Sequence, residues 1–441
     1  MHIAPINYRR TPEDGNRRRS GAALVAICAL AGAAFFGTFR HTARGDTATS
    51  ALNLADFGAA GRGSDDTKIF QTALAAAAWS RRPLRVPQSP SPYQVQPLFL
   101  PANTQLLLDA GVVIQAAPGY SPAQKLINIK DVSSVKIVGR GALLRMRRDQ
   151  YTDGEYRHCI DIEGATDVRL IGITCNDSGG DGLYIGPGVQ GFSKNIVVEE
   201  CTFFNNRRQG VSIISGIDVW IRRCNFLRTN GAAPEDGIDL EPNTAKDRLE
   251  NIHIEDCLTE GNHGDGLGFS LAALTSQSAP VDITVLRLRS NYNQRAGITA
   301  SYEVNGALPG VPGKILIDRA AAVGNGTYGA VASFFSGSGP VITFQDLAVY
   351  DANQTRTTYD NAAIAVKRGG GGIGPTGNVY FVNPMIVDTT GKLDHYFTLR
   401  DYSEVGFAHV QISGSVSFSG AAHARPYGLV QGKSTDGVSI P

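Results

Sequence analysis

The densest group of side chains that could act in catalysis lies in the segment PEDGIDLEPN, residues 234–243. It carries the carboxylates Glu235, Asp236, Asp239 and Glu241 in a region otherwise rich in apolar residues, glycine and asparagine. Two nearby carboxyl groups can serve as general acid and general base, and several carboxylate oxygens can bind Ca²⁺. The segment is therefore a solvated turn, a calcium site or the acid and base of an enzyme.

A repeat around this segment indicates which elements position it. Short alternating strands that begin with glycine recur as GLYI, GVSI, GIDL, GLGF and GITA, at residues 182, 210, 237, 266 and 297. The period is near 29 residues, with Gly- and Asn-rich turns and no helical periodicity between the strands. This pattern is typical of a parallel β-solenoid, in which each strand hydrogen-bonds to the same strand of the next coil.

Alternation along the strand assigns a face to each residue of GIDLEP. Side chains alternate inward and outward, so Ile238 and Leu240 face the core while Asp239 and Glu241 face outward. Two residues along a strand rise by ~6.6 Å, a spacing that suits paired carboxylates. Small outward residues on neighbouring coils predict a shallow groove beside this pair, and we expect three glycines to form it: Gly266, Gly268 and Gly297.

Polar residues at the strand starts complete the predicted site. We predict that Asp239 and Glu241 are the catalytic pair, and that three turn residues assist them: Asp236, Asp265 and His263. The predicted substrate-binding residues are Tyr184, Asp181, Arg207, Arg208 and Arg295. Asp before Gly is also ordinary turn chemistry, and arginines at coil edges are often merely solvated, so a structural role stays open for Asp181, Asp265 and the arginines.

Two further columns follow the same period. Cys201, Cys224 and Cys257 occupy one position in successive coils, where we expect an inward-facing stack of free cysteines. Asparagine recurs five or six residues later, and an amide ladder at that turn would satisfy the bent backbone. Its predicted members are Asn206, Asn230, Asn262 and Asn293.

The segment ADFGAAGRGSDDTKIFQTALAAA, residues 55–77, resembles the N-terminal motif of the pectate-lyase-like superfamily, which includes rhamnogalacturonase- and epimerase-like pectate lyase domains. The matching residues are Asp56, Phe57, Gly58, Ala59, Asp65, Asp66, Thr67 and Gln71. The resemblance implies an all-β fold, a right-handed parallel β-helix (a single-stranded solenoid) with a short N-terminal capping helix. It also implies that an extended saccharide binds the outward face.

Several functions fit these residues. We favour a glycoside hydrolase, and similarity to polygalacturonases implies inversion. The segments GGDG and EDGID partly match two motifs of those enzymes. Their other two motifs, Gly-His-Gly and Arg-Ile-Lys, are absent. A polysaccharide lyase or C5-epimerase acting on a uronate polymer is the alternative, because GIDLEP is similar to the Gly-Phe-Asp-Pro-His-Glu strand of mannuronan epimerases. There Asp239 takes the catalytic aspartate's place, and Glu241 replaces the histidine. A non-catalytic carbohydrate-binding or fibre-like solenoid is a third class.

The sequence also allows predictions about metals, cofactors and partners. We expect no cofactor and no metal, with Ca²⁺ held by Asp236, Asp239 and Glu241 as the minority option, since no EF-hand-like spacing is present. The formal net charge of +1 lacks the basic footprint of a nucleic-acid binder. The expected partner is a polysaccharide, and the arginines just ahead of the neighbouring strands would suit an acidic sugar.

The N-terminus indicates export. Arg17, Arg18 and Arg19 precede an uncharged apolar run at 21–37, which is typical of a cleaved signal peptide or of a signal-anchor that tethers the chain to a membrane. We predict that residues 1–45 form this segment and that 46–441 form one β-helix domain, with its N-terminal motif and cap at 50–80 and its best-defined coils at 125–390. The domain would lie in the periplasm, in the cell envelope or outside the cell.

Overall fold

The computed structural model describes residues 50–59, 61–301, 310–333, 337–358, 360–368, 376–401, 406–420, 423–428, 435–436 and 439. Clusters of contacts divide the chain into residues 1–48 and 49–441, and all described residues belong to the second part. The predicted export segment at 21–37 therefore lies outside the described residues. In the part that the structure describes, no helix is long and apolar enough to cross a bilayer.

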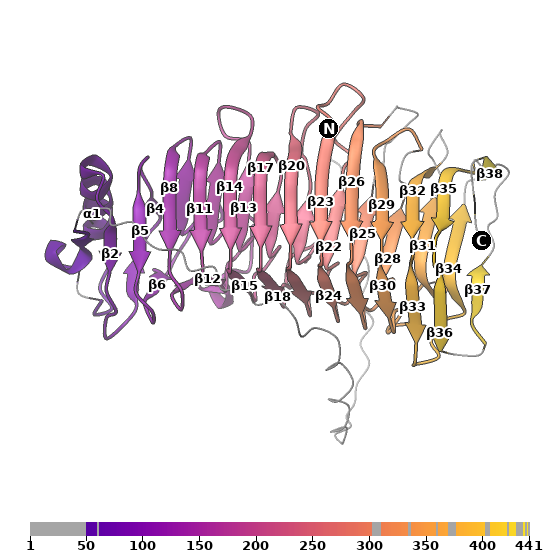
Figure 1. Ribbon diagram of the computed structural model, residues 1–441. Coiled ribbons are helices and arrows are strands. Elements are labelled where there is room, and N and C mark those ends of the chain that lie inside the picture. Colours follow the sequence, from indigo (N-terminus) through magenta and orange to yellow (C-terminus); the bar gives the residue numbers. More distant parts are fainter. Residues whose placement is uncertain are drawn as a thin grey trace, which may run out of the picture. The chain divides into compact units, whose positions relative to one another are not determined.

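Three parallel sheets form the domain, and we call them sheets A, B and C (Figure 1). Sheet A contains β1 (Leu52–Asn53), β2 (Leu84–Val86), β5 (Gln105–Leu108), β8 (Ser133–Val138), β11 (Thr166–Ile171), β14 (Ser193–Glu199), β17 (Gly216–Arg222), β20 (Leu249–Glu255), β23 (Val281–Leu286), β26 (Gly313–Asp318), β29 (Val341–Gln345), β32 (Thr376–Val382), β35 (Phe407–Ser413) and β38 (Thr435–Asp436). Sheet B contains β3 (Tyr93–Val95), β6 (Val113–Ala116), β9 (Leu143–Arg145), β12 (Thr174–Asn176), β15 (Thr202–Phe204), β18 (Asn225–Leu227), β21 (Leu258–Glu260), β24 (Arg289–Asn291), β27 (Ala321–Val323), β30 (Ala348–Tyr350), β33 (Met385–Asp388) and β36 (Ser417–Gly420). Sheet C contains β4 (Leu98–Phe99), β7 (Ile127–Lys130), β10 (Ile160–Glu163), β13 (Leu183–Gly186), β16 (Val211–Ile213), β19 (Ile238–Leu240), β22 (Leu267–Ser270), β25 (Ile298–Ser301), β28 (Ala330–Ser333), β31 (Ala362–Arg368), β34 (His395–Asp401) and β37 (Arg425–Gly428).

Each coil passes through the sheets in the order C, A, B. One coil is β13, β14 and β15, and the chain then returns to sheet C at β16, directly beside β13. Every pairing is parallel and joins equivalent strands of successive coils, as the 29-residue period predicts. The prediction of an all-β, right-handed parallel β-helix is confirmed.

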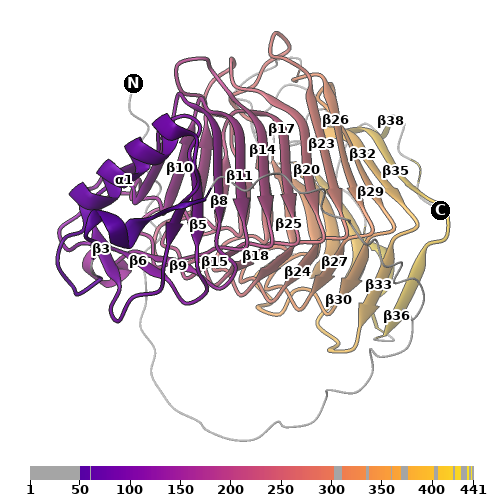
Figure 2. The same ribbon diagram turned by 60° about the vertical axis from the view of Figure 1, so that its left-hand side comes forward.

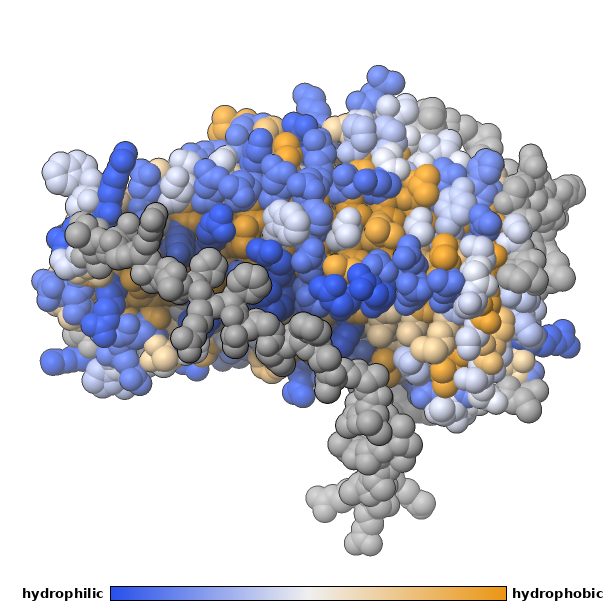
Figure 3. Space-filling model, viewed as in Figure 1, coloured by the Kyte–Doolittle hydropathy of each residue, from blue (hydrophilic) through white to orange (hydrophobic). Residues whose placement is uncertain are grey.

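The interior of the solenoid is filled by inward-facing aliphatic and aromatic side chains. Ile185, Ile213, Leu240 and Phe269, for example, stack along sheet C and are fully buried. Stacking of like side chains in successive coils extends the core along the solenoid. On the face seen in Figure 3, hydrophobic residues are interspersed among hydrophilic ones.

The glycines recur because a side chain at their positions would collide with the interior of the turn. A Cβ on Gly237 would lie 2.8 Å from Asn262 Nδ2, and a Cβ on Gly297 would lie 2.8 Å from Asn325 Nδ2. A Cβ on Gly266 would lie 1.9 Å from Ser290 Oγ. These glycines therefore face the interior turn, and the prediction that Gly266 and Gly297 shape an outer groove is wrong.

The asparagines beside these glycines form the expected ladder, with one correction. Asn262 Nδ2 donates to Asn293 Oδ1 at 2.9 Å, and Asn293 Nδ2 donates to Asn325 Oδ1 at 3.1 Å. Asn206 holds the same position two coils before Asn262 and accepts a bond from the Ser178 backbone. Asn230 does not join, because its neighbour Thr229 takes the buried position.

The cysteine column is confirmed as a buried stack of free thiols. Cys201, Cys224 and Cys257 are fully buried and unpaired, like Cys159 and Cys175. Each Sγ lies near backbone carbonyl oxygens of its own or the preceding coil, such as Cys224 Sγ to the Val198 oxygen at 3.6 Å. Cysteine acts here as a small core residue.

A single helix lies at the N-terminal end of the described solenoid (Figure 2). Helix α1 (Thr67–Ser80) buries Phe70, Leu74 and alanines against the first coils, and the short 3₁₀ helix η1 (Leu54–Phe57) packs beside it. Asp65 Oδ1 accepts the backbone N–H of Thr67 at the start of α1. Capping of an apolar solenoid end by an amphipathic helix is confirmed.

Candidate active site on the outer face of sheet C

A row of polar residues runs across the outer face of sheet C. The strand register aligns the central residues of β10, β13, β16, β19 and β22, which are Asp161, Tyr184, Ser212, Asp239 and Gly268. Rows of aligned strands in neighbouring coils are ~4.8 Å apart, so side chains of adjacent coils contact one another directly. A saccharide lying across the coils would therefore meet these groups in sequence.

Asp239 is held by side chains of the preceding coil. Gln209 Nε2 donates to Asp239 Oδ2 at 2.7 Å, and Gln209 Oε1 accepts the backbone N–H of Asp236 at 2.7 Å. Gln209 thus fixes both the carboxyl group of Asp239 and the turn that leads into β19. Asp239 has one defined orientation as a result.

Asp239 is 1% exposed, although the alternation along the strand directs it outward. The pleat does direct it away from the core, but Gln209 and the Asp236 turn pack around it. Burial and then the neighbouring Glu241 and Asp236 carboxylates raise the pKa of Asp239 well above its ordinary value. The protonated form of Asp239 is favoured at higher pH than in an exposed aspartate.

Gly268 is buried and lies close to two of the predicted acids. A Cβ at this position would lie 3.0 Å from Asp236 Oδ2, which is a tight contact, and 3.6 Å from Asp239 Oδ1. Of the three glycines predicted to shape the groove, only this one borders the acidic site. Burial and then Asp265 raise the pKa of Asp236, so both acids beside Gly268 favour the protonated form.

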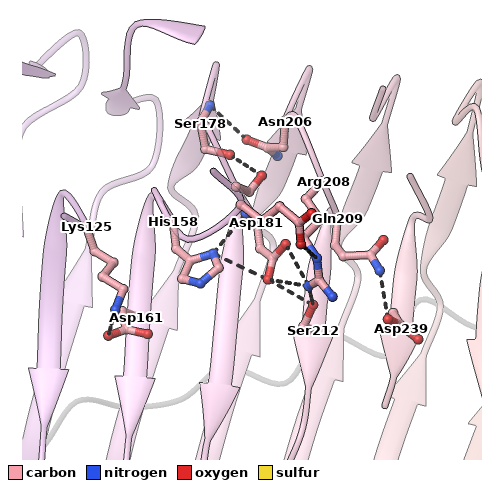
Figure 4. A network of polar contacts seen from close by, with 12 residues as sticks. Lys125, His158, Asp161, Ser178, Asp181, Asn206, Arg208, Gln209, Ser212 and Asp239 are labelled. Atoms are coloured by element: carbon pink, nitrogen blue, oxygen red, sulfur yellow. Dashed lines mark hydrogen bonds and ion pairs between the residues drawn. The ribbon is translucent and has the colours of Figure 1, made fainter. Parts of the chain in front are cut away.

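Glu241 lies in a different environment, beside the guanidinium of Arg208 (Figure 4 shows Arg208 among its other partners). Arg208 Nη2 is 3.2 Å from Glu241 Oε2, Nη1 is 3.4 Å from Asp181 Oδ2, and Nε is 3.6 Å from Glu155 Oε2. The Glu241 side chain is 36% exposed, whereas Asp181 is fully buried. Glu241 is therefore a solvent-accessible carboxylate that an arginine holds in place.

Asp181 is the centre of this cluster of charges. Ser212 Oγ donates to Asp181 Oδ2 at 2.9 Å, and Arg208 approaches the same carboxyl group. Burial raises the pKa of Asp181 to about 6, and Arg208 and Ser212 limit the rise. Burial opposes the charge of Arg208 as well, but Asp181 and Glu241 outweigh it and raise its pKa, so Arg208 stays charged.

His158 and Asp161 belong to the site, although the sequence analysis did not name them. His158 Nδ1 accepts the backbone N–H of Asp181 at 2.9 Å, and its ring stacks on Tyr184 with centroids 5.0 Å apart. Burial, then Lys125 and Arg208, lower the pKa of His158 well below its ordinary value. The ring is therefore neutral, and its 3.4 Å approach to Asp181 Oδ2 is not an ion pair at neutral pH.

Asp161 is a buried acid with an incomplete set of partners. Its Oδ2 lies 3.7 Å from Lys125 Nζ, and its Oδ1 is buried without a hydrogen bond in the described residues (Figure 4). Burial raises the pKa of Asp161 to about 7, and Lys125 limits the rise. Asp161 is therefore protonated at higher pH than an exposed aspartate.

The register contains the signal for both residues. His158 aligns with Asp181, and Asp161 aligns with Tyr184, because Ile160 pairs with Leu183. The segment HCIDIE at 158–163 is the same repeat unit as DGLYIG at 181–186, with cysteine in place of glycine. A search for strands that begin with glycine passes over that coil.

The structure disperses other predicted residues. His263 is exposed, and no side-chain partner is recorded for it among the described residues, so it is not brought to the carboxylates. Arg207 does not join the acids either. Its Nη1 donates to the Gly154 carbonyl on the sheet B side of the turn, whereas Arg208 of the same turn reaches the acids. The bend at Arg207 and Arg208 directs the two side chains to different partners.

Asp236 and Asp265 share a structural task. Asp236 Oδ1 accepts the backbone N–H of Asp265 at 2.6 Å, and Asp265 Oδ1 accepts that of Ala296 at 2.7 Å. Each carboxylate thus secures the same turn of the next coil. Arg295 lies at the edge, more than half exposed, with Nε 3.9 Å from Asp265 Oδ1.

The described residues contain no group of three or more His, Cys, Asp or Glu side chains arranged to hold a metal ion. Calcium at Asp236, Asp239 and Glu241 stays a prediction, as does the alternative of no metal.

Comparisons with known proteins identify the architecture. The family model for a right handed beta helix region matches residues 152–332. The chain has the right-handed β-helix fold. The match agrees with the fold that the resemblance to the pectate-lyase-like superfamily implies. A comparison with curated proteins found no relative of this β-helix by sequence.

Solved structures agree on the fold. The A-module of the Azotobacter vinelandii mannuronan C-5 epimerase AlgE4 is 16% identical with a TM-score of 0.61, covering 88% of this chain and 99% of that one. PfbA, a surface adhesin of Streptococcus pneumoniae, is 14% identical with a TM-score of 0.60, covering 86% and 93%. A family 28 exopolygalacturonase of Yersinia enterocolitica is 13% identical with a TM-score of 0.53, covering 88% and 78%. At these identities the likeness establishes the fold alone.

Proposed function

We propose that this β-helix protein is an exported glycoside hydrolase that cleaves an acidic polysaccharide on the outer face of sheet C, with Asp239 and Glu241 as the reacting carboxyl groups. One observation carries the proposal: two neighbouring carboxyls lie in opposite environments. Asp239 is buried with a raised pKa, and Glu241 is partly exposed and paired with Arg208. Environments that separate two carboxyl groups in this way are typical of an acid and base pair.

The division of labour follows from these environments. Protonated Asp239 donates its proton to the glycosidic oxygen, so that the leaving sugar departs as an alcohol. Glu241, which water can reach, accepts a proton from the water that attacks the anomeric carbon. After the bond breaks, Asp239 is ionised and Glu241 is protonated, and proton exchange with solvent restores both. An attack by water from the opposite side inverts the anomeric configuration, as in the polygalacturonases that the sequence resembles.

The surrounding residues act as positioning groups in this proposal. Gln209 orients the Asp239 carboxyl, and Arg208 keeps Glu241 in place while it neutralises Asp181. Tyr184, stacked on His158, lies two coils before Asp239 in the same row, with Ser212 between them. Sugar rings commonly contact aromatic side chains, so Tyr184 is our candidate for a neighbouring subsite.

A lyase or C5-epimerase acting on a uronate polymer is the second candidate. The observation in its favour is the neutral His158 next to Tyr184 and Arg208, since proton abstraction at C5 needs a base and a group that stabilises the uronate carboxylate. Mannuronan C-5 epimerases are among the structures that share the fold. Arg208 is already surrounded by three carboxylates, which favours hydrolysis over this candidate.

The products of the reaction distinguish the candidates. The full chain should be incubated with galacturonan, mannuronan and neutral polysaccharides, with calcium and with a chelator. We expect new reducing ends without an unsaturated uronide, and an inverted anomer by NMR immediately after cleavage. Near-ultraviolet absorbance would instead indicate elimination, and exchange at C5 without chain scission would indicate epimerisation. Binding without any change in the polymer would favour a non-catalytic solenoid.

A further inference from the structure

A second concave site lies at the sheet B side of the solenoid, away from the row of acids. Its cavity has a volume of about 750 Å³ and lies where β6, β9, β12 and β15 end. Arginines predominate among its charged lining residues, which are Arg145, Arg147, Arg148, Arg207, Asp149 and Asp177. The volume is in the range of pockets that hold small organic ligands, roughly 300–1,000 Å³, and exceeds the needs of a single ion.

The four arginines have neutral partners. Arg145 Nη2 donates to Gln115 Oε1 at 3.1 Å, and Arg147 Nε donates to the Ala116 carbonyl at 2.8 Å. Arg148 reaches the backbone carbonyls of Asn205 and Asn230, and Arg207 that of Gly154. In the described part of the chain, no ion pair is recorded for any of them.

Arginines elsewhere behave differently. Many lie within 4 Å of a carboxylate, including Arg85, Arg140, Arg157, Arg223, Arg248, Arg287 and Arg319. Asp177 accepts a hydrogen bond from Asn205 Nδ2 at 2.6 Å, which does not remove its negative charge. The pocket lining therefore carries four arginines against two aspartates, a formal net charge of +2.

The environment of Arg148 and Arg145 supports this conclusion. Burial lowers the pKa of Arg148, and the nearby positive charge of Arg207 lowers it further, against the pull of Asp177. Arg145 Nε is buried and has no hydrogen-bond partner among the described residues. A bound anion would relieve the repulsion between guanidinium groups, because each guanidinium can bind a carboxylate through two parallel N–H bonds.

The pocket is separate from the sheet C site but shares an element with it. Arg207 lines the pocket and Arg208 joins the acids, so one turn contributes to both. The segment between β9 and β10 lies between them: Arg148 and Tyr151 line the pocket, whereas Glu155 approaches Arg208. An acidic chain could therefore occupy one site while an independent segment occupies the other.

We propose that this arginine-lined pocket is a second binding site, which takes a carboxylate-bearing sugar of an acidic saccharide outside the sheet C groove. The positive charge of the pocket follows from the contacts of its arginines, whereas the choice of a saccharide as ligand rests on the proposed function. Such a site would keep the protein on its polymer while the groove releases product. Its contribution is affinity, without a part in the chemistry.

Calorimetric titration of the full chain tests the proposal. The probes are trimers of galacturonate and of mannuronate, with a neutral glucose trimer and sodium sulfate as separate arms. We expect two acidic trimers to bind per chain, with the pocket site weakened at high salt because the contacts are ionic. Arg145→Gln should weaken the pocket site by about 10- to 100-fold, the effect of one charge-assisted contact, and leave the groove site unchanged.

Matched variants separate the two sites. Arg287→Gln removes an exposed paired arginine of another coil and should bind like the wild type. Asp239→Asn should keep the pocket site even if turnover is lost, so failure of the hydrolase proposal leaves this test intact. If Arg145→Gln does not fold, Arg207→Gln replaces it.

Three results would overturn the proposal. They are unchanged binding by the folded Arg145→Gln and Arg207→Gln variants, equal affinity for the neutral trimer, and binding of sulfate but not of either acidic trimer. The last result would identify a site for a free oxyanion.

Discussion

The outer face of sheet C has two regions with the same backbone and different surfaces. From β10 to β19 the aligned outer residues are Asp161, Tyr184, Ser212 and Asp239. From β25 to β31 the same row contains Thr299, Val331 and Ala365, and the last two belong to a small apolar cluster outside the main core. The register continues without a break between the regions.

This difference shows that the solenoid provides positions, and that side chains decide what each position does. Asp161 and Asp239 in the first region are buried acids with raised pKa values, whereas Val331 and Ala365 in the second bring no charge into the fold. Apolar residues at these positions are the less costly arrangement. The retention of several desolvated acids in the first region therefore supports the functional site that we propose.

Asp239→Asn should have the largest effect. The amide cannot donate the catalytic proton, so we expect turnover to fall by about 10²- to 10⁴-fold on the polymer that the wild type cleaves. The hydrogen bond from Gln209 can still form to the amide oxygen, so the variant should fold. Initial rates of reducing-end release measure the effect.

Thr299→Val is the matched control in the second region. It changes the same row two coils further along and should leave the rate unaffected. Full activity in Asp239→Asn, or an equal loss in Thr299→Val, would contradict the assignment of chemistry to the first region.

Arg208→Gln should have the second largest effect, which is a loss of stability. Removing one partner of a buried ion pair costs about 3–5 kcal/mol, because the other charge is left without compensation. The loss in the free energy of unfolding should be larger at pH 8 than at pH 5, since Asp181, with a pKa of about 6 even beside Arg208, can be protonated at the lower pH. Urea unfolding at both pH values measures it.

Arg287→Gln, in an exposed pair with Asp256, should cost at most about 1 kcal/mol. A loss in Arg208→Gln no larger than this would mean that the charges of the first region are solvated.

Asp161→Asn should change how stability depends on pH. The folded-state pKa of Asp161 is about 7, above the ordinary value of 3.8. The folded state therefore binds this proton more tightly, and the stability it contributes is complete below about pH 4 and is lost as pH rises through about 7. The variant should lack this decline and should gain about 4 kcal/mol relative to the wild type between pH 4 and pH 8, because each unit of pKa difference corresponds to ~1.36 kcal/mol.

The check is thermal or urea unfolding across that pH range. Asp282→Asn, an exposed aspartate on sheet A, should keep the wild-type profile. Identical profiles for Asp161→Asn and the wild type would show that Asp161 is not a desolvated acid.

The fold could be predicted from the sequence because every coil repeats the same physical pattern. Gly237 and its equivalents recur since a Cβ there would collide with the interior of the turn, and Cys201, Cys224 and Cys257 recur as a core column. These constraints are local, so the sequence of each repeat shows them independently. The period alone then specifies which strands pair.

The site was less predictable because it depends on contacts between coils. Alternation directs Asp239 outward, but nothing in GIDLEP shows that Gln209 would bury it. The separation of Arg207 from Arg208, and the isolation of His263, likewise depend on how turns of different length pack. His158 could have been found by aligning HCIDIE with DGLYIG. It was missed because the repeat was defined by a glycine at the start of each strand.

Gly268→Ala should have the smallest effect and gives the finest test of the two regions. Gly268 is the first residue of the outer row after Asp239, and a side chain there would closely approach Asp236 and Asp239. A methyl group would lie 3.0 Å from Asp236 Oδ2, so that carboxyl must move, and the added group would obstruct a sugar that approaches Asp239. We expect turnover to fall by about tenfold, equivalent to ~1.4 kcal/mol in the barrier, with little change in the free energy of unfolding. Thr299→Ala, one coil further along the same row, should keep both the rate and the stability within experimental error. If Gly268→Ala destabilises the protein without affecting the rate, Gly268 is needed for packing as Gly237 is, and the catalytic region ends at β19.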